Sequence, residues 1–213
     1  MMERPLINAT VIEANDQPLA TWRGGTTRAI YAEPAETLSN MTAAQLWVGT
    51  ATIERDGPYS VFANRMRIHL LMRGNGLQLH FQEPTETITL PTLEQATFPG
   101  DRPLTVTLLN GTVEAFNLIF QPTVQAAVRV IHLMQAASIT IPQAVARHQI
   151  FYMVAGTCNI AQTTRTPVRM THGAALVGAL DEEYELTCTG GPATIIHTTI
   201  WNTAILNTAI ASL

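Results

Sequence analysis

Short runs of alternating apolar and polar residues, separated by Gly, Pro and Asn, recur along this chain of 213 residues. Alternation with a period of two is typical of half-buried β-strands, whereas few segments are long and periodic enough for an amphipathic helix. The sequence therefore predicts an all-β fold with few short helices. Many short strands at this spacing indicate a sandwich or jelly roll, and the chain is long enough for two jelly-roll-like barrels or sandwiches packed together.

Two β-hairpins are expected in the first half of the chain. In each, two runs of alternating residues flank a short turn, which reads Gly74-Asn75-Gly76 in the first and Asn110-Gly111 in the second. These turn residues tolerate the positive φ angles that a tight hairpin requires. The expected strand pairs are 66–73 with 77–81 and 104–108 with 113–120.

The second half shows the same alternation more weakly. A junction bounded by two prolines is expected at 121–142, which gives an N-terminal half at 1–121 and a C-terminal half at 122–213. The middle of the junction, 124–137, is read as a strand, with a helix as the alternative. A short helix is expected near 42–46. The strands expected after the junction are 149–154, 158–163, 174–177, 184–187 and 194–201.

The charge composition excludes several functions. The chain has 16 acidic and 12 basic residues, a formal net charge of -4, and thus no basic surface for a phosphate backbone, so nucleic acid is not an expected partner. Every basic residue is Arg, which excludes Schiff-base and lysine-base chemistry. The charged fraction of 13% is low for a soluble protein, and this points to self-association, for example as a homodimer.

Neither the N-terminus nor the apolar runs of the sequence suggest a membrane protein. The N-terminus lacks the basic start and apolar stretch of a secretory signal, and no apolar run approaches the roughly 20 residues needed to span a bilayer. We therefore expect a cytoplasmic protein with no membrane partner. Cys158 and Cys188 lie far apart in sequence without a CxxC motif, which favours two buried reduced thiols over a disulfide.

A series of short motifs runs through the first half. In order these are Trp22-Arg23-Gly24-Gly25-Thr26-Thr27-Arg28, Gly57-Pro58-Tyr59-Ser60-x-Phe62, Arg67, Gly74-x-Gly76-Leu77-x-Leu79, Phe98-x-Gly100-Asp101-x-Pro103 and Gly111-x-Val113-x-x-Phe116-Asn117-Leu118. The series resembles the signature of the HutD/Ves family in content and order over about 22–120, and the strand expected to follow 181–186 resembles the end of the family's second half. The resemblance implies a bicupin fold, an association of some members with histidine utilisation, and no established catalytic activity.

The chain also departs from the family pattern. The family's Trp-Lys-Asn-Gly-Gly-Gly loop is shortened to Trp22-Arg23-Gly24-Gly25, Ala29 stands where the family has Glu, and Ala115 replaces the Asp of its Asp-Phe-Asn motif. An alanine in place of a carboxylate cannot make the charge-assisted bonds that would orient a polar ligand. These departures indicate a divergent member with a different ligand, or with none. Cupins often bind a divalent ion through a His-x-His pair, which this sequence lacks, so no metal and no cofactor are predicted.

Arg67 is the centre of the candidate ligand site. It lies on a strand face with other basic side chains, and such like charges repel unless an anion screens them. On one interpretation Arg67, helped by Arg28 and Ser60, binds a small carboxylate metabolite through its guanidinium fork. On the alternative, Arg67 pairs with an internal acid such as Asp101 and stabilises the sheet. The full candidate set is Trp22, Thr26, Arg28, Ser60, Arg67, His69 and Asn117.

The other candidates have structural alternatives of the same kind. Trp22 is expected in the core or in a pocket wall, and Gly24-Gly25 before Thr26 forms either an anion-binding turn or an ordinary turn between strands. Asn117 is either a structural hydrogen-bonding residue, the favoured interpretation, or a polar point in the pocket.

The sequence is compatible with three functions. The leading hypothesis is a non-catalytic bicupin that binds a small carboxylate metabolite as a regulator or accessory protein. The second is a metal-independent isomerase or lyase, which requires His69 or His80 in a cavity beside an acid such as Glu54. The third is a structural protein that dimerises through its second half, including the amphipathic stretch 201–206, with a vestigial pocket.

Overall fold

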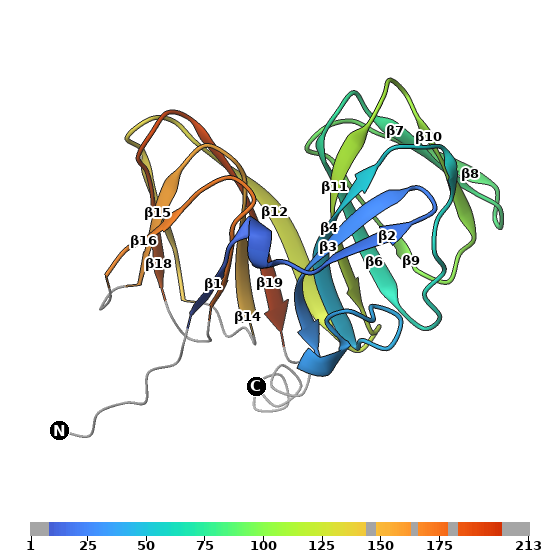
Figure 1. Ribbon diagram of the computed structural model, residues 1–213, viewed down its shortest axis with the longest axis horizontal. Coiled ribbons are helices and arrows are strands. Elements are labelled where there is room, and N and C mark those ends of the chain that lie inside the picture. Colours follow the sequence, from blue (N-terminus) through green and yellow to red (C-terminus); the bar gives the residue numbers. More distant parts are fainter. Residues whose placement is uncertain (1–8, 144–147, 163–165, 179–182, 202–213) are drawn as a thin grey trace, which may run out of the picture. The chain divides into compact units, whose positions relative to one another are not determined.

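The computed structural model describes residues 9–143, 148–162, 166–178 and 183–201. Strands make up most of this part of the chain, and its helices are two single 3₁₀ turns, η1 (Ala14–Asp16) and η2 (Ala35–Thr37) (Figure 1). No described helix has the length and apolar character to cross a membrane. The all-β prediction is confirmed. The helix expected near 42–46 is wrong, because Leu46 already begins strand β4 (Leu46–Ile53).

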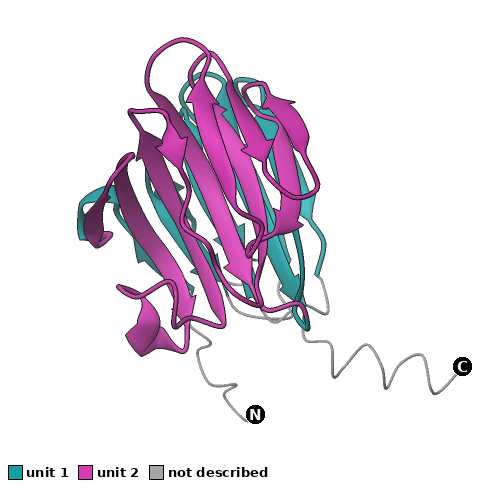
Figure 2. Ribbon diagram, turned by 90° about the vertical axis from the view of Figure 1, so that its right-hand side faces the viewer, with its two compact units in different colours: residues 1–16, 123–213 teal, residues 17–122 magenta. Residues whose placement is uncertain are grey.

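The strands form two compact units, which Figure 2 shows in different colours. Unit 2 comprises 17–122, and unit 1 comprises 123–213 together with 1–16. The boundary between them lies next to the expected one, but the N-terminus differs from expectation. Strand β1 (Thr10–Ile12) hydrogen-bonds to β17 (Ala175–Gly178) and so completes a sheet of the C-terminal half.

Unit 2 contains a six-stranded and a four-stranded antiparallel sheet. In the larger sheet the strand order is β2 (Leu19–Trp22), β3 (Gly25–Glu33), β4, β11 (Val113–Phe120), β6 (Met66–Arg73) and β9 (Gln95–Pro99). In the smaller sheet it is β5 (Gly57–Pro58), β10 (Leu104–Leu108), β7 (Leu77–Phe81) and β8 (Glu86–Leu90). Apolar side chains of both sheets meet in one core, which includes Leu71, Leu77, Leu79, Val106 and Ala115.

Unit 1 repeats this plan with a five-stranded and a four-stranded antiparallel sheet. The first runs β1, β17, β14 (His148–Ala155), β19 (Ala193–Trp201) and β12 (Gln125–Leu133). The second runs β13 (Ser138–Ile141), β18 (Tyr184–Cys188), β15 (Cys158–Gln162) and β16 (Val168–Met170). Its core includes Phe151, Met153, Ile160, Leu186 and Ile195. The strand interpretation of the junction is confirmed by β12, and a strand lies within a residue or two of each one expected after it.

The two expected hairpins are wrong, although all four of their strands exist. β6 pairs with β9 and β11, whereas β7 pairs with β8 and β10, so the Gly74-Asn75-Gly76 turn carries the chain from one sheet to the other. The Asn110-Gly111 turn makes the same change between β10 and β11. The physical reason lies in β6, whose two edges are taken by β9 and β11, so that no edge is left for β7.

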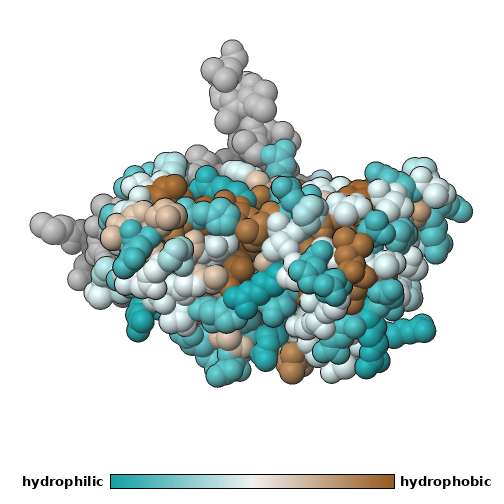
Figure 3. All heavy atoms as spheres, turned by 90° about the horizontal axis from the view of Figure 1, so that it is seen from above, coloured by the Kyte–Doolittle hydropathy of each residue, from teal (hydrophilic) through white to brown (hydrophobic). Residues whose placement is uncertain are grey.

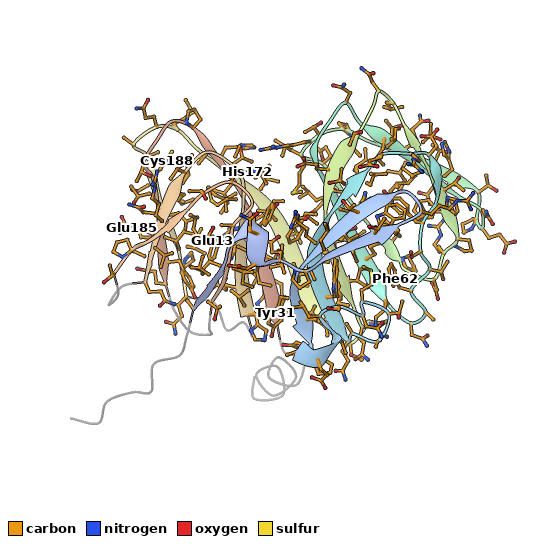
Figure 4. The ribbon with its side chains drawn as sticks, viewed as in Figure 1. Glu13, Tyr31, Phe62, His172, Glu185 and Cys188 are labelled. Carbon is orange, nitrogen blue, oxygen red and sulfur yellow. The ribbon has the colours of Figure 1, made fainter. Side chains whose placement is uncertain are left out.

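Two further sequence expectations concern the cysteines and the surface. Cys158 and Cys188 lie opposite one another on β15 and β18 and are buried free thiols, as expected (Cys188 is labelled in Figure 4). Apolar residues on the face shown in Figure 3 stand in separate groups among hydrophilic ones. The expected homodimer stays a prediction, which sedimentation would test, and most of the stretch 201–206 lies outside the described residues.

Candidate functional site

Three polar side chains meet on the inner face of the larger sheet of unit 2. Arg67 and His69 are two residues apart on β6, and Asn117 of β11 lies directly opposite His69. Their side chains share the face that carries core residues Leu71 and Ala115, so they point between the sheets. All three are buried, with exposed fractions of 8% for Arg67, 0% for His69 and 3% for Asn117.

One oxygen atom holds these side chains together. Asn117 Oδ1 accepts hydrogen bonds from Arg67 Nε at 3.0 Å, from Arg67 Nη2 at 2.7 Å and from His69 Nδ1 at 2.7 Å. Because Nδ1 of His69 must donate, Nε2 is its acceptor, and the Tyr59 hydroxyl donates to it across 3.4 Å. In its neutral form His69 therefore has both ring nitrogens engaged.

Burial sets the charge of the site. Burial, together with a smaller effect of the neighbouring Arg67 cation, lowers the pKa of His69 to about 3. Burial also lowers the pKa of Arg67 to about 10 and raises the pKa of the Tyr59 hydroxyl above its ordinary value. At neutral pH the site thus carries a single positive charge, which belongs to Arg67.

This positive charge has no carboxylate partner within the described part of the chain. Asp101, the acid expected to pair with Arg67, is exposed, and the neutral amide of Asn117 takes its place, so that expectation is wrong. The guanidinium carbon instead lies 4.6 Å from the ring centre of Tyr59 and 5.9 Å from those of Phe62 and Phe98. Aromatic faces stabilise a cation only in part, so the buried charge remains available to an anion.

The low pKa of His69 predicts a pH-dependent stability. The pKa of His69 is 6.5 in the unfolded chain and about 3 in the folded protein. Below about pH 6.5 the unfolded chain therefore binds the proton before the folded protein does, and the free energy of unfolding decreases as the pH falls towards 3. Between pH 6.5 and 5 this single group should remove roughly 2 kcal/mol from the free energy of unfolding. Chemical denaturation at pH 7 and pH 5 measures it. In His69→Gln, whose amide still donates to Asn117, the loss should be smaller; equal losses in both proteins would contradict the assignment.

A cavity of about 150 Å³ opens above the Arg67 and Asn117 side chains. It lies within unit 2, and its walls come mainly from the six-stranded sheet and from the loop that carries Tyr59, Ser60 and Phe62 (Phe62 is labelled in Figure 4). Apolar and aromatic side chains dominate the walls: Ala20, Trp22, Met41, Trp47, Ala51, Ile53, Tyr59, Phe62 and Ile119. The polar lining residues are Thr21, Thr27, Ser60, Arg67 and Asn117.

The part of the cavity wall formed by Trp22 depends on Gly24, two residues further along the chain. A Cβ atom on Gly24 would lie 2.3 Å from Cη2 of Trp22, so the indole can occupy its place only because residue 24 has no side chain. The indole also stands edge-on to Tyr59, with ring centres 5.8 Å apart. Its Nε1 is buried and has no hydrogen-bond partner among the described residues.

Gly24→Ala is expected to displace the Trp22 indole, because the added methyl group would overlap its ring. The tryptophan fluorescence of the variant should therefore differ from that of the wild type. Arg23→Ala, at the exposed neighbouring position, is the control and should leave the fluorescence unchanged. A Gly24→Ala protein with unchanged fluorescence would show that the wall tolerates the extra methyl group.

The cavity contains some of the residues expected from the sequence and not others. Trp22, Ser60, Arg67 and Asn117 line it, and His69 lies beneath it in contact with Asn117. Thr26 and Arg28 do not line it; the neighbouring Thr27 does, and Arg28 Nη1 donates to the carbonyl of Gln17 at 3.4 Å. Thr27, Trp47 and Tyr59 were missed as site residues. Tyr59 belongs to a quoted motif, but its role depends on contacts that the motif does not encode.

The cavity does not offer the ligands of a metal ion. Both nitrogens of His69 are engaged, the lining residues include no Asp or Glu, and the Arg67 cation would repel a divalent ion. Across the described ranges, no group of three or more His, Cys, Asp or Glu side chains gathers in one place. His80 bonds Thr87 Oγ1 on the outer side of its sheet, and Glu54 is exposed, so neither joins His69 at the cavity.

Each unit is a pair of antiparallel sheets around its own core, and this arrangement defines a protein with a cupin-like fold. A mutant of Bacillus subtilis oxalate decarboxylase shares the fold, with a TM-score of 0.70 at 8% identity over 94% of this chain and 79% of that one. The particular family follows from the sequence. The chain belongs to the HutD family, whose profile matches residues 14–196.

Solved structures of two Pseudomonas proteins have the same fold. HutD from Pseudomonas fluorescens SBW25 has a TM-score of 0.67 at 21% identity, and a conserved protein of unknown function from Pseudomonas aeruginosa PAO1 has a TM-score of 0.79 at 19% identity; each alignment covers 91% of this chain and 99% of the other. An uncharacterised 21.2 kDa protein from the region 3' of hutC in Pseudomonas putida is 30% identical over 115 residues. That alignment covers 53% of this chain and 58% of the relative, a little over half of each.

Proposed function

We propose that unit 2 is a binding module for a small monoanionic carboxylate, recognised by Arg67 at the floor of the cavity. The observation that carries the proposal is a buried guanidinium with no carboxylate partner among the described residues. Holding an uncompensated charge away from water is costly, and a ligand carboxylate would offset that cost through charge-assisted hydrogen bonds.

The size and chemistry of the cavity narrow the ligand. A volume of about 150 Å³ is well below the roughly 300–1,000 Å³ of pockets for drug-sized ligands. Aromatic walls suit a compact apolar or planar body, and Ser60 and Thr27 offer hydroxyl groups. The buried, unpartnered Trp22 Nε1 is a further donor that a ligand oxygen could satisfy. One positive charge matches one carboxylate.

We further propose that the ligand is a metabolite of histidine utilisation and that the protein acts as a regulator or accessory protein without catalysis. The support comes from relatives: one is named HutD and another lies in a hutC region. The isomerase alternative requires an imidazole beside a carboxylate, and among the described residues His69 has Asn117 and Tyr59 as its hydrogen-bond partners instead.

A thermal-shift screen tests the proposal. Purified protein is titrated with formate, acetate, glutamate and histidine, and with acetamide as a neutral isostere of acetate, at constant ionic strength. A ligand that binds only the folded state raises the thermal midpoint. At least one carboxylate should raise it while acetamide does not; no shift with any carboxylate, or an equal shift with acetamide, would refute a carboxylate-binding module.

A further inference from the structure

Unit 1 contains a second cluster of polar side chains on the inner face of its own larger sheet. Arg129 of β12 lies opposite His197 of β19, and Gln149 of β14 lies opposite Thr199, two residues further along β19. These side chains share the face that carries core residues such as Phe151. Three of them are buried, with exposed fractions of 1% for Gln149, 2% for His197 and 9% for Thr199.

His197 connects the cluster and fixes the direction of Arg129. Its Nδ1 accepts a hydrogen bond from Arg129 Nε at 2.9 Å, so its Nε2 carries the proton and donates to Gln149 Oε1, also at 2.9 Å. The imidazole stacks on Phe151, with ring centres 4.6 Å apart and planes 8° from parallel. Burial, with a smaller effect of Arg129, lowers the pKa of His197 to about 3 and keeps the ring neutral.

The arrangement leaves most of the Arg129 guanidinium for another partner. Its Nε is occupied by His197, while neither Nη atom bonds to a described residue, and no ion pair to a carboxylate is found for it in the described ranges. Arg129 borders a cavity of about 270 Å³ whose lining includes no Asp or Glu. The rest of the lining consists of the polar residues Gln143, Gln149, His197 and Thr199 and the apolar residues Ala127, Ile141, Pro142 and Trp201.

We propose that this cavity is a second ligand site, which takes a small organic carboxylate with a flat or apolar body. His197 and Gln149 hold Arg129 by one nitrogen, and its two terminal nitrogens form a bidentate fork for the carboxylate. A single guanidinium and no second cation match a monoanion better than a phosphate dianion. The buried polar groups on this otherwise apolar face position the guanidinium of Arg129. This second site does not depend on the function proposed for Arg67.

The three tryptophans allow the two cavities to be observed separately. Trp22 and Trp47 line the cavity of unit 2, whereas Trp201 lines that of unit 1. The indole N–H signals in a ¹⁵N NMR spectrum, assigned with single Trp→Phe variants, are followed while acetate or benzoate is added, with benzamide as the neutral control. Benzoate suits the larger volume and apolar walls of this cavity.

The Trp201 signal should shift on addition of at least one carboxylate and not with benzamide. In Arg129→Gln, which changes an exposed side chain, the midpoint of the Trp201 titration should move to at least tenfold higher concentration, while the Trp22 and Trp47 response is unchanged. In Arg67→Met the Trp22 and Trp47 titrations should move to higher concentration, while the Trp201 titration is unchanged. Three results would overturn the second site: no shift of the Trp201 signal with either carboxylate, an equal shift with benzamide, or the same titration midpoint in Arg129→Gln as in the wild type. If only the Trp22 and Trp47 signals fail to shift, the function proposed for Arg67 is wrong and the second site stands.

Discussion

Arg67→Met is expected to abolish carboxylate binding without destabilising the ligand-free protein. The substitution removes the one charge among the described lining residues of the unit 2 cavity and leaves a shorter, flexible apolar side chain, while Asn117 Oδ1 still accepts from His69. Replacing a buried charge with a well-packed apolar group is often neutral or stabilising by about 1–4 kcal/mol. Affinity should fall by at least about 100-fold, or roughly 3 kcal/mol. Thermal midpoints with and without acetate measure both effects.

Arg67→Lys is the matched control for charge. Lysine retains the positive charge but not the planar fork that bonds Asn117 twice, so binding should weaken without disappearing. If Arg67→Met binds acetate as well as the wild type does, the guanidinium does not recognise the ligand. If instead Arg67→Met strongly destabilises the ligand-free protein, Arg67 has the structural role that the sequence left as an alternative.

Asn117→Leu is expected to lower the free energy of unfolding of unit 2 by about 3–5 kcal/mol, as is typical when one partner of a buried charged contact is removed. Leucine has nearly the shape of asparagine but no acceptor, so Arg67 Nε, Arg67 Nη2 and His69 Nδ1 all lose their bond at once. Denaturant unfolding at pH 7 measures the change.

Asn117→Asp separates this structural effect from binding. An aspartate supplies an acceptor for all three donors, so at pH 7 most of the stability lost in Asn117→Leu should return. It also neutralises Arg67 from within, so carboxylate binding should be lost as completely as in Arg67→Met. An Asn117→Leu protein as stable as the wild type would mean that the three hydrogen bonds contribute little to the fold.

The sequence predicted where the strands are much better than how they pair. Alternation is a local property, so β6, β7, β10 and β11 were all found, but a short turn between two strands does not reveal that the second strand lies in the facing sheet. Pairing depends on partners far along the chain. β11, for example, bonds to β4 and β6, more than 40 residues earlier at each pair in register.

The site was predicted in part for a similar reason. Arg67 stood out because it shares a strand face with other basic side chains, and Asn117 because an amide interrupts an apolar run, although the contact between them spans 50 positions. Thr26 and Thr27 are both polar, so the pattern could not tell which of them faces the cavity, and the register of β3 against β4 decides for Thr27 through its pairing with Ala51. The sequence does not predict the polar cluster of unit 1, because Arg129, Gln149 and His197 belong to no motif.

The pairing of β1 with β17 has a consequence for synthesis of the protein on the ribosome. Residues 17–122 form their unit from one continuous stretch, so both sheets of unit 2 can assemble as soon as that stretch has emerged. Strand β1 emerges first but finds its partner only after Ala175–Gly178 has been made. The N-terminal strand therefore waits unpaired through most of translation, and a chaperone that binds extended apolar segments would have its longest access to the nascent chain there.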